Sequence, residues 1–171
     1  MGPDMTDVML GGVPIRLHSG APQCEYSPIG GVSTRRRSGG ALVKMRNWRK
    51  TAITVRGSGW MGPGFAGLNF DVPLELRCTQ PLSLHTVTLT GTIPGSIRPD
   101  VAPWALAYVG GQWVPAAVAM VGNAFTLTAV VDATEYHVRW LPMFTVLCEP
   151  PAEALDSSSA SFDWAITAEE I

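Results

Sequence analysis

Short segments in which apolar and polar residues alternate recur along this chain, separated by residues that favour turns. Thr51 to Arg56 and Ser83 to Thr90 alternate in this way and are rich in β-branched side chains. Alternation with a period of two places successive side chains on opposite faces of an extended strand. Both segments are therefore predicted to be strands with one buried face.

Two glycine pairs mark predicted hairpins. The first pair lies between Leu10 and Val13, and the second lies between Val109 and Gln112, each flanked by apolar segments. Adjacent glycines adopt the positive φ angles that tight hairpin turns require, at no steric cost. Each pair is therefore expected to join two antiparallel strands.

The second half of the chain is predicted to continue as an antiparallel meander, with strands at 125–131, 136–140 and 144–148. Strands at intervals of about 8–12 residues, with turns between them, favour a sandwich or a barrel. The 18 glycines and 14 prolines leave few windows for a long helix. We predict an all-β fold, an antiparallel β-sandwich or barrel with long loops, in which under about a fifth of the residues are helical.

The predicted organisation is one β domain, residues 1–148, followed by a C-terminal extension, residues 149–171. A length of 171 residues suits a single hydrophobic core. Within the domain, residues 19–40 are interpreted as a long loop or arm, and residues 57–69 as a loop rich in glycine. The extension begins as a linker that ends in a run of serines, and a docking strand follows it.

The docking strand is predicted from three large apolar residues near the end of the chain. Phe162, Trp164 and Ile166 alternate with smaller or polar residues. Burying each of them typically contributes about 1.5–3 kcal/mol, so all three need a pocket. Residues 162–168 are therefore expected to join a sheet edge, either in their own domain or in a neighbouring subunit.

The composition indicates that part of the surface is hidden in an assembly. The chain is 46% hydrophobic and 15% charged, whereas an average globular protein is roughly 25% charged. A monomer must keep its water-facing patches polar, so a surface this poor in charge favours burial against other chains.

The charges are unevenly distributed. Eight of the 12 Lys and Arg residues lie between Arg35 and Arg56, whereas residues 149–171 hold six acids and no base. These two regions are electrically complementary and are expected to face each other, either within one copy or between copies in a ring. The net charge of −2 argues against a general nucleic-acid binder.

The cysteines and apolar segments indicate neither export nor membrane insertion. Cys24, Cys78 and Cys148 are widely spaced and odd in number, which does not suit a disulfide framework. They are interpreted as partly buried small hydrophobes of a protein made in a reducing cytosol. The start of the chain lacks the features of a signal peptide, and the apolar stretches are shorter than the roughly 20 residues that cross a bilayer.

The sequence lacks the spacings that metal, nucleophile or nucleotide chemistry requires. His18, His85 and His137 are scattered, and no cysteines stand at zinc-ligand spacing. Residues 57–62 match Gly-x-Gly-x-x-Gly, but a proline follows where a helix should begin. We predict no enzyme activity, no cofactor, and no catalytic, cofactor-binding or metal-binding residues. Paired carboxylates of a glycoside hydrolase come together only in the fold and are not visible at this level.

The basic run that starts at Arg35 is interpreted as a solvated or partner-facing arm. Turn formers surround it, and no aromatic residues that would stack on bases are interleaved with it, so no specific nucleic-acid binding is expected. Trp48 lies next to Arg49, and an indole stacked on a guanidinium is common at protein interfaces. The predicted subunit-interface residues are Arg35, Arg36, Arg37, Trp48, Arg49, Trp60, Phe162, Trp164 and Ile166.

Five segments carry a resemblance to known proteins: Leu10–Ile15, Trp48–Lys50, Ile53–Trp60, Pro73–Cys78 and Phe162–Glu170. These segments resemble small tail proteins of long-tailed bacteriophages. The resemblance covers about half of the chain and carries no catalytic motif. It implies a β-rich structural protein of the virion, repeated around the tail axis.

The expected function is that of a tail or baseplate subunit that forms a ring. Its expected partners are copies of itself and other tail proteins, and its expected location is the virion tail, after synthesis in the host cytoplasm. Six tryptophans leave a second hypothesis, a carbohydrate-binding or receptor-binding module, which would need several of them exposed on one surface.

Overall fold

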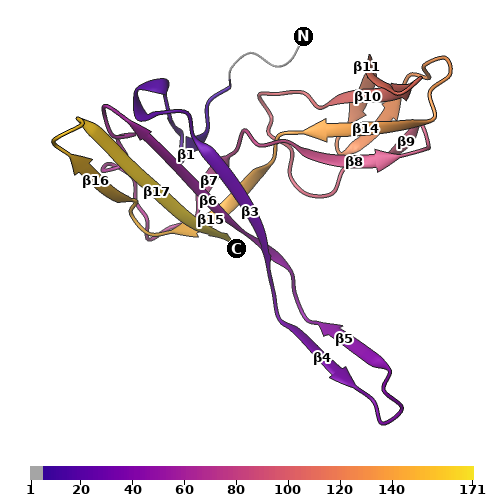
Figure 1. The fold of residues 1–171 in the computed structure, drawn as a ribbon, viewed down its shortest axis with the longest axis horizontal. Coiled ribbons are helices and arrows are strands. Elements are labelled where there is room, and N and C mark those ends of the chain that lie inside the picture. Colours follow the sequence, from indigo (N-terminus) through magenta and orange to yellow (C-terminus); the bar gives the residue numbers. More distant parts are fainter. Residues whose placement is uncertain (1–5) are drawn as a thin grey trace. The chain divides into compact units, whose positions relative to one another are not determined.

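The computed structural model describes residues 6–171, and nearly all of its regular structure is antiparallel strand (Figure 1). The chain divides into two compact units, which we call unit 1 and unit 2. Unit 1 holds residues 6–9 and 76–144, and unit 2 holds residues 10–75 and 145–171. The predicted all-β antiparallel fold is confirmed. The single helical element of the described residues is a 3-10 turn, η1 (Leu17–Ser19).

The largest sheet has eight strands in the order β2-β1-β7-β15-β17-β6-β3, with β16 paired to β17 beside this path. A separate two-stranded sheet, β4-β5, lies between β3 and β6 in the chain. The strands are β1 (Met9–Leu10), β2 (Val13–Pro14), β3 (Gln23–Ile29), β4 (Val32–Arg36), β5 (Leu42–Arg46), β6 (Lys50–Gly59), β7 (Leu74–Arg77), β15 (Met143–Cys148), β16 (Ala152–Asp156) and β17 (Ser161–Glu170).

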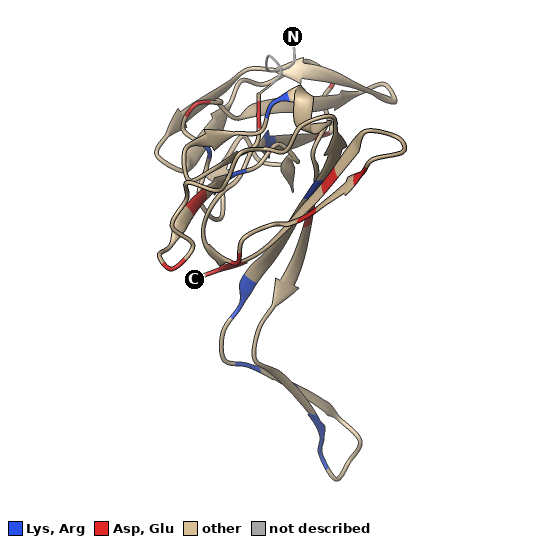
Figure 2. Cartoon of the chain, turned by 90° about the vertical axis from the view of Figure 1, so that its left-hand side faces the viewer, with Lys and Arg blue, Asp and Glu red and all other residues tan. Residues whose placement is uncertain are grey.

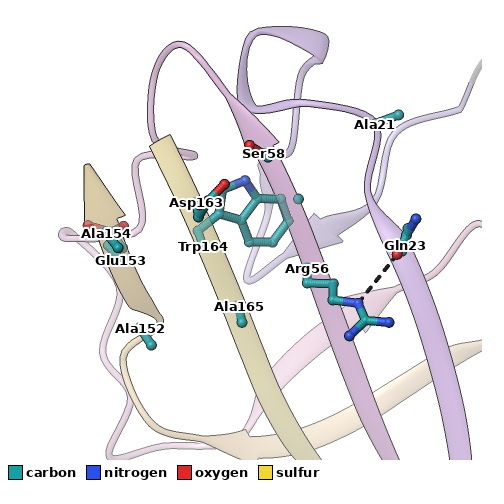
Figure 3. Close-up of a pocket in the computed structure, with 11 residues that line it drawn as sticks. Ala21, Gln23, Arg56, Ser58, Ala152, Glu153, Ala154, Asp163, Trp164 and Ala165 are labelled. Atoms are coloured by element: carbon teal, nitrogen blue, oxygen red, sulfur yellow. Dashed lines mark hydrogen bonds between the residues drawn. The ribbon is translucent and has the colours of Figure 1, made fainter. Parts of the chain in front are cut away.

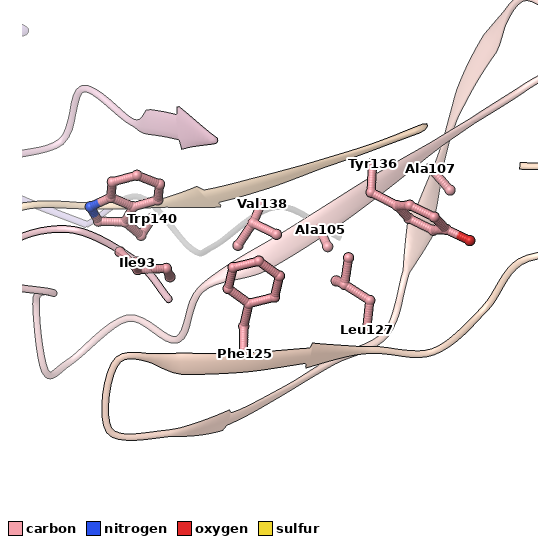
Figure 4. Close-up of a cluster of buried hydrophobic side chains, with 8 residues drawn as sticks. All are labelled: Ile93, Ala105, Ala107, Phe125, Leu127, Tyr136, Val138 and Trp140. Carbon is pink, nitrogen blue, oxygen red and sulfur yellow. The ribbon is translucent and has the colours of Figure 1, made fainter. Parts of the chain in front are cut away.

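Unit 1 is a small sandwich of two antiparallel sheets, with orders β11-β10-β14-β8 and β12-β13-β9. Figure 4 shows Phe125 and Leu127 of β13 facing Ala105, Tyr136 and Val138 of the other sheet. No sheet formed by residues 6–171 closes into a barrel, so the sandwich is the alternative that the structure supports. The strands are β8 (Leu82–Thr86), β9 (Thr90–Thr92), β10 (Trp104–Val109), β11 (Gln112–Ala116), β12 (Val118–Val121), β13 (Ala124–Leu127) and β14 (Glu135–Trp140).

The glycine pairs form the hairpin turns predicted for them. Gly11 and Gly12 have φ angles of 55° and 85°, and Gly110 and Gly111 have φ angles of 56° and 84°. Two consecutive positive φ angles match the type of turn whose twist suits a two-residue hairpin. They join β1 to β2 and β10 to β11.

Residues 83–90, expected to form one strand, are divided between β8 and β9. The hydroxyl of Thr86 accepts a hydrogen bond from the amide of Thr88, and the hydroxyl of Thr88 donates to the carbonyl of Thr90. Such local bonds offer the backbone an alternative to the strand ladder. The break lets the chain leave one sheet of unit 1 and enter the other.

Three segments expected to be irregular contain strand residues. Residues 19–40, expected as a loop or arm, hold β3 and β4, and residues 149–161, expected as a linker, hold β16. Both β4 and β16 pair with a neighbouring strand across a short turn, so hairpin formation orders them despite their polar composition. Residues 57–59 of the expected glycine-rich loop continue β6.

Candidate interaction surfaces

Residues 30–49 form a protruding β-hairpin, which we call the arm. β4 pairs with β5 in a register that places Arg35 opposite Val43 and Thr34 opposite Lys44. The turn is closed by the amide of Arg37, which donates to the carbonyl of Ala41, and by the amide of Gly40, which donates to the carbonyl of Arg37. Figure 2 shows basic residues, and no acidic ones, along the arm. Its bases are Arg35, Arg36, Arg37, Lys44, Arg46 and Arg49.

The arm has almost no core of its own. Every residue from Val32 to Arg49 is exposed except Val43, which is half-buried. Exposed apolar side chains are therefore spread among the bases, with Leu42 at 60% and Met45 at 52% of full exposure. A two-stranded hairpin of this kind is at best marginally stable alone in water. Pairing between β4 and β5 thus leaves most side chains of the arm uncovered.

The two tryptophans predicted at the interface lie in different places. Trp48 is about half exposed at the base of the arm, where its indole nitrogen is 3.0 Å from the position that a Cβ on Gly31 would occupy. Trp60 is 70% exposed in the loop after β6, and its ring centroid is 5.9 Å from that of His18. The arm leaves β6 at Lys50, whereas Trp60 follows the other end of that strand. The sequence-predicted residues thus do not form one continuous surface.

Phe162, Trp164 and Ile166 lie on β17, an inner strand of the unit 2 sheet. One side of β17 pairs with β6 along nearly its whole length. Its other side pairs with β16 near the start of the strand and with β15 near its end. Trp164 and Ile166 are 2% and 0% exposed. The segment therefore joins the sheet of its own chain, and these two side chains contribute to its core rather than to an outer surface. Phe162 is half-buried beside Gly62.

The indole of Trp164 is held from several directions. Its Nε1 donates a hydrogen bond of 2.7 Å to the carbonyl of Ser19, and Phe65 packs edge-on at a centroid distance of 6.4 Å. A Cβ on Gly57 would lie 2.7 Å from the indole Cζ2, so glycine allows β6 to pass directly beneath the ring. This close approach explains part of the glycine-rich composition at residues 57–62.

A cavity of about 580 Å³ lies against strands β3, β6, β16 and β17 of the unit 2 sheet (Figure 3). Arg56, Glu153 and Asp163 bring charge to it, and Arg56 donates from Nε to Oε1 of Gln23 at 3.3 Å. Its remaining lining is mostly small: Ala21, Gly57, Ser58, Ala152, Ala154 and Ala165. The cavity offers an alanine-lined hollow with a few polar groups, and none of the three histidines or three cysteines is among its lining residues.

Unit 1 carries a row of aromatic side chains on the outer face of its four-stranded sheet. Tyr108 and Trp113 pair across β10 and β11, with ring centroids 4.9 Å apart, and Trp113 lies 4.4 Å from His137 of β14. His85 of β8 continues the row at 5.6 Å from His137, and its Nε2 is 2.8 Å from Oε2 of Glu135. We call these five residues the aromatic row. Sequence reasoning missed it because the residues come from four strands.

Unit 1 also contains a buried arginine that the sequence patterns did not indicate. Arg98 is 1% exposed, and its Nε and Nη2 donate to the two carboxylate oxygens of Asp100 at 2.7 and 3.0 Å. Its Nη1 donates to the carbonyl of Cys78 at 3.2 Å. The hydrogen bonds from Arg98 hold the pKa of Asp100 below its usual value, and Arg77 adds a weaker attraction. The charges of Arg98 and Asp100 are therefore compensated within unit 1.

The cysteines match their interpretation as partly buried residues. Cys78 and Cys148 are buried, and Cys24 is half-buried. Burial raises the pKa of the Cys148 thiol, and the charge of Glu149 raises it further. A raised pKa keeps this thiol protonated and weakly nucleophilic at neutral pH.

Among residues 6–171, no group of three or more His, Cys, Asp or Glu side chains is placed to hold a metal ion. The same residues include no helix long and apolar enough to cross a membrane. No protein-family model matches the chain, and no curated protein matches its sequence. The geometry of these surfaces is therefore the basis of the functional argument.

Proposed function

We propose that the chain is a non-catalytic structural subunit that assembles with copies of itself through the arm. The arm is the observation that carries this proposal. It concentrates basic residues and exposed apolar side chains on a hairpin that has almost no core of its own. Such a hairpin gains order and buries its apolar groups when it lies against a second chain.

The assembly we propose is a ring in the tail or baseplate of a bacteriophage. This part of the proposal is supported by the resemblance of the segments around Trp48 and Ile53 to small tail proteins, and by the low content of charged residues. Other tail proteins would be further partners, and the virion tail would be the location of the protein. A structural role of this kind needs no catalytic group and no cofactor.

The proposal is tested by measuring the mass of the protein in solution. Sedimentation and native mass spectrometry at low ionic strength are expected to show oligomers of the wild-type chain. An arm-less variant, in which an Asn-Gly turn replaces residues 31–47, is expected to be monomeric with an unchanged β-type circular dichroism spectrum. A wild-type chain that stays monomeric up to the highest soluble concentration would contradict self-assembly.

A second candidate function is binding of a cell-surface carbohydrate. The expected surface with several exposed tryptophans is not formed by the described residues of either unit, and the support comes instead from the aromatic row, in which Trp113 lies among other ring side chains. Trp113 is 41% exposed, and the row combines ring faces with the carboxylate of Glu135. Ring faces stack on the apolar faces of sugars, while carboxylates accept hydrogen bonds from hydroxyl groups. Binding to immobilised bacterial lipopolysaccharide or cell-wall fragments, lost in Trp113→Ala and kept in Trp60→Ala, would favour this function.

A further inference from the structure

β16 presents an exposed edge of the unit 2 sheet. One side of β16 pairs with β17, from Ala152 opposite Ala165 to Asp156 opposite Ser161. On its other side, no strand of the described residues pairs with it, and all five of its residues are exposed. An unprotected edge of this kind is a template for the addition of a strand from another chain.

The β16–β17 hairpin is acidic, whereas the arm is basic. Residues 149–171 contain six acids and no base. Four of the acids lie at the β16 end of the hairpin, namely Glu149, Glu153, Asp156 and Asp163, whereas Glu169 and Glu170 lie at the end of β17 near the arm. No acid occurs anywhere between Glu25 and Asp71, the stretch that contains the arm. Opposite charges of this kind steer two surfaces together and fix their orientation.

The arm of one chain and the turn end of its β16–β17 hairpin, which includes all of β16, lie at opposite ends of β6. The arm leaves β6 at Lys50, whereas the register of β17 on β6 places Phe162 opposite Gly59. Ten residues of strand separate these ends by roughly 30 Å, and Figure 1 shows the arm extending away from β16. The arm and the acids at the β16 end of the hairpin therefore meet most directly when they belong to different copies.

The two elements also match in length and in their apolar residues. β4, β5 and β16 each contain five residues. Leu155 of β16 is 65% exposed and Leu42 of β5 is 60% exposed. Ala152 and Ala154 belong both to β16 and to the lining of the cavity, so a strand added at this edge would lie beside an open hollow.

We infer that the arm of one copy adds to the edge of β16 in the next copy, with its bases against the acids of the β16–β17 hairpin. This inference rests on the proposed self-assembly and names the surface that receives the arm. Because the two contacting surfaces differ, every bound copy still offers a free arm or a free hairpin. The contact therefore propagates until a ring closes or a filament forms.

The first test is a charge swap. An arm-reversed variant carries Arg35→Glu, Arg36→Glu and Arg37→Glu, and a hairpin-reversed variant carries Glu153→Lys and Asp163→Lys. Each is expected to associate at least about tenfold more weakly than wild type at low salt. A variant that combines both sets is expected to regain assembly, and so is an equal mixture of the two single-set variants.

The matched control is Glu25→Lys with Asp71→Lys, which changes the net charge by the same amount at two exposed acids outside the hairpin. It is expected to assemble like wild type. An equal loss of assembly in this control would show that only net charge matters and would overturn the inference. Normal assembly of the hairpin-reversed variant would also overturn it, while leaving self-assembly itself in place.

The second test is cross-linking. A chain with Lys44→Cys mixed with a chain with Ala154→Cys is expected to form a disulfide-linked dimer under mild oxidation, well above the background from the native cysteines. Failure to cross-link in a sample that sedimentation shows to be assembled would mean that the arm binds elsewhere. If the wild-type chain does not assemble at all, both the inference and the proposed function fail.

Discussion

The arm and the β16–β17 hairpin are both antiparallel hairpins of unit 2, but they differ in how many of their side chains are buried. In the arm, five-residue strands pair only with each other, and nearly every side chain is exposed. In the other hairpin, β17 is an inner strand whose Trp164 and Ile166 are buried. Both segments carry large apolar residues, so apolar content alone does not separate core from surface. The number of neighbouring strands separates the buried side chains from the exposed ones in these two hairpins.

The largest expected effect follows from the burial of Trp164. Trp164→Ala is expected to lower the free energy of unfolding by about 3–5 kcal/mol, because it leaves a cavity beside Phe65 and removes the hydrogen bond to Ser19. The matched change in the arm, Trp48→Ala, is expected to change it by less than about 0.5 kcal/mol. Urea denaturation followed by circular dichroism measures both, and equal losses would contradict the contrast between the hairpins.

A smaller loss in the free energy of unfolding is expected from a substitution at Gly57. Gly57→Ala would place a Cβ 2.7 Å from the indole of Trp164 and 3.1 Å from the carbonyl oxygen of Ser19. Overpacking of this kind costs about 1–3 kcal/mol of the free energy of unfolding. Gly39→Ala in the turn of the arm serves as the control, because a Cβ there would meet no atom within 4 Å. A control that destabilises as much as Gly57→Ala would show that the arm is packed.

The charges of the arm are expected to affect assembly rather than stability. Reversing Arg35, Arg36 and Arg37 should leave the free energy of unfolding within about 0.5 kcal/mol of wild type. Assembly of the wild-type chain should weaken as sodium chloride rises from about 0.01 to 1 M, because screening shortens from about 30 to about 3 Å. The residual assembly of the reversed variant should depend less on salt. Sedimentation at each salt concentration measures the extent of assembly. Assembly of the wild-type chain that does not change with salt would exclude an electrostatic contact.

The periodicity of the sequence predicted the strands that carry a buried face. Thr51–Arg56 lies within β6, and alternation correctly placed Trp164 and Ile166 on one buried face. β16 escaped prediction because Ala152–Asp156 contains no β-branched residue. It forms a strand only because β17 offers a partner, and such pairing is decided by tertiary context.

The division into two units escaped prediction for a related reason. Most of unit 1, residues 76–144, is inserted between the two parts of unit 2, and no serine-rich or glycine-rich linker marks either junction at Leu76 or Phe144. The aromatic row and the Arg98–Asp100 pair depend on which strands become neighbours. Their residues lie in segments that individually look like ordinary strands and turns, so local patterns contain no signal for them.

The smallest predicted effect is a shift in the pKa of one carboxyl group, which lies in the turn of the β16–β17 hairpin and has no counterpart in the turn of the arm. The β16–β17 turn is organised by Asp156, whose Oδ1 accepts bonds from the Ser158 hydroxyl at 2.6 Å and the Ser158 amide at 2.9 Å, while Oδ2 accepts one from Ser159. These bonds, chiefly those from Ser158, lower the pKa of Asp156 from 3.8 to about 2. Because the pKa is depressed in the folded chain, this stabilisation is present above pH 3.8 and is lost as the pH falls through about 2. Ser158→Ala is expected to move the pKa back toward 3.8, as followed by NMR titration of the carboxyl carbon, whereas the exposed Ser33→Ala in the arm should leave it unchanged. A titration near pH 4 in the wild-type chain would show that the turn is not organised by this carboxylate.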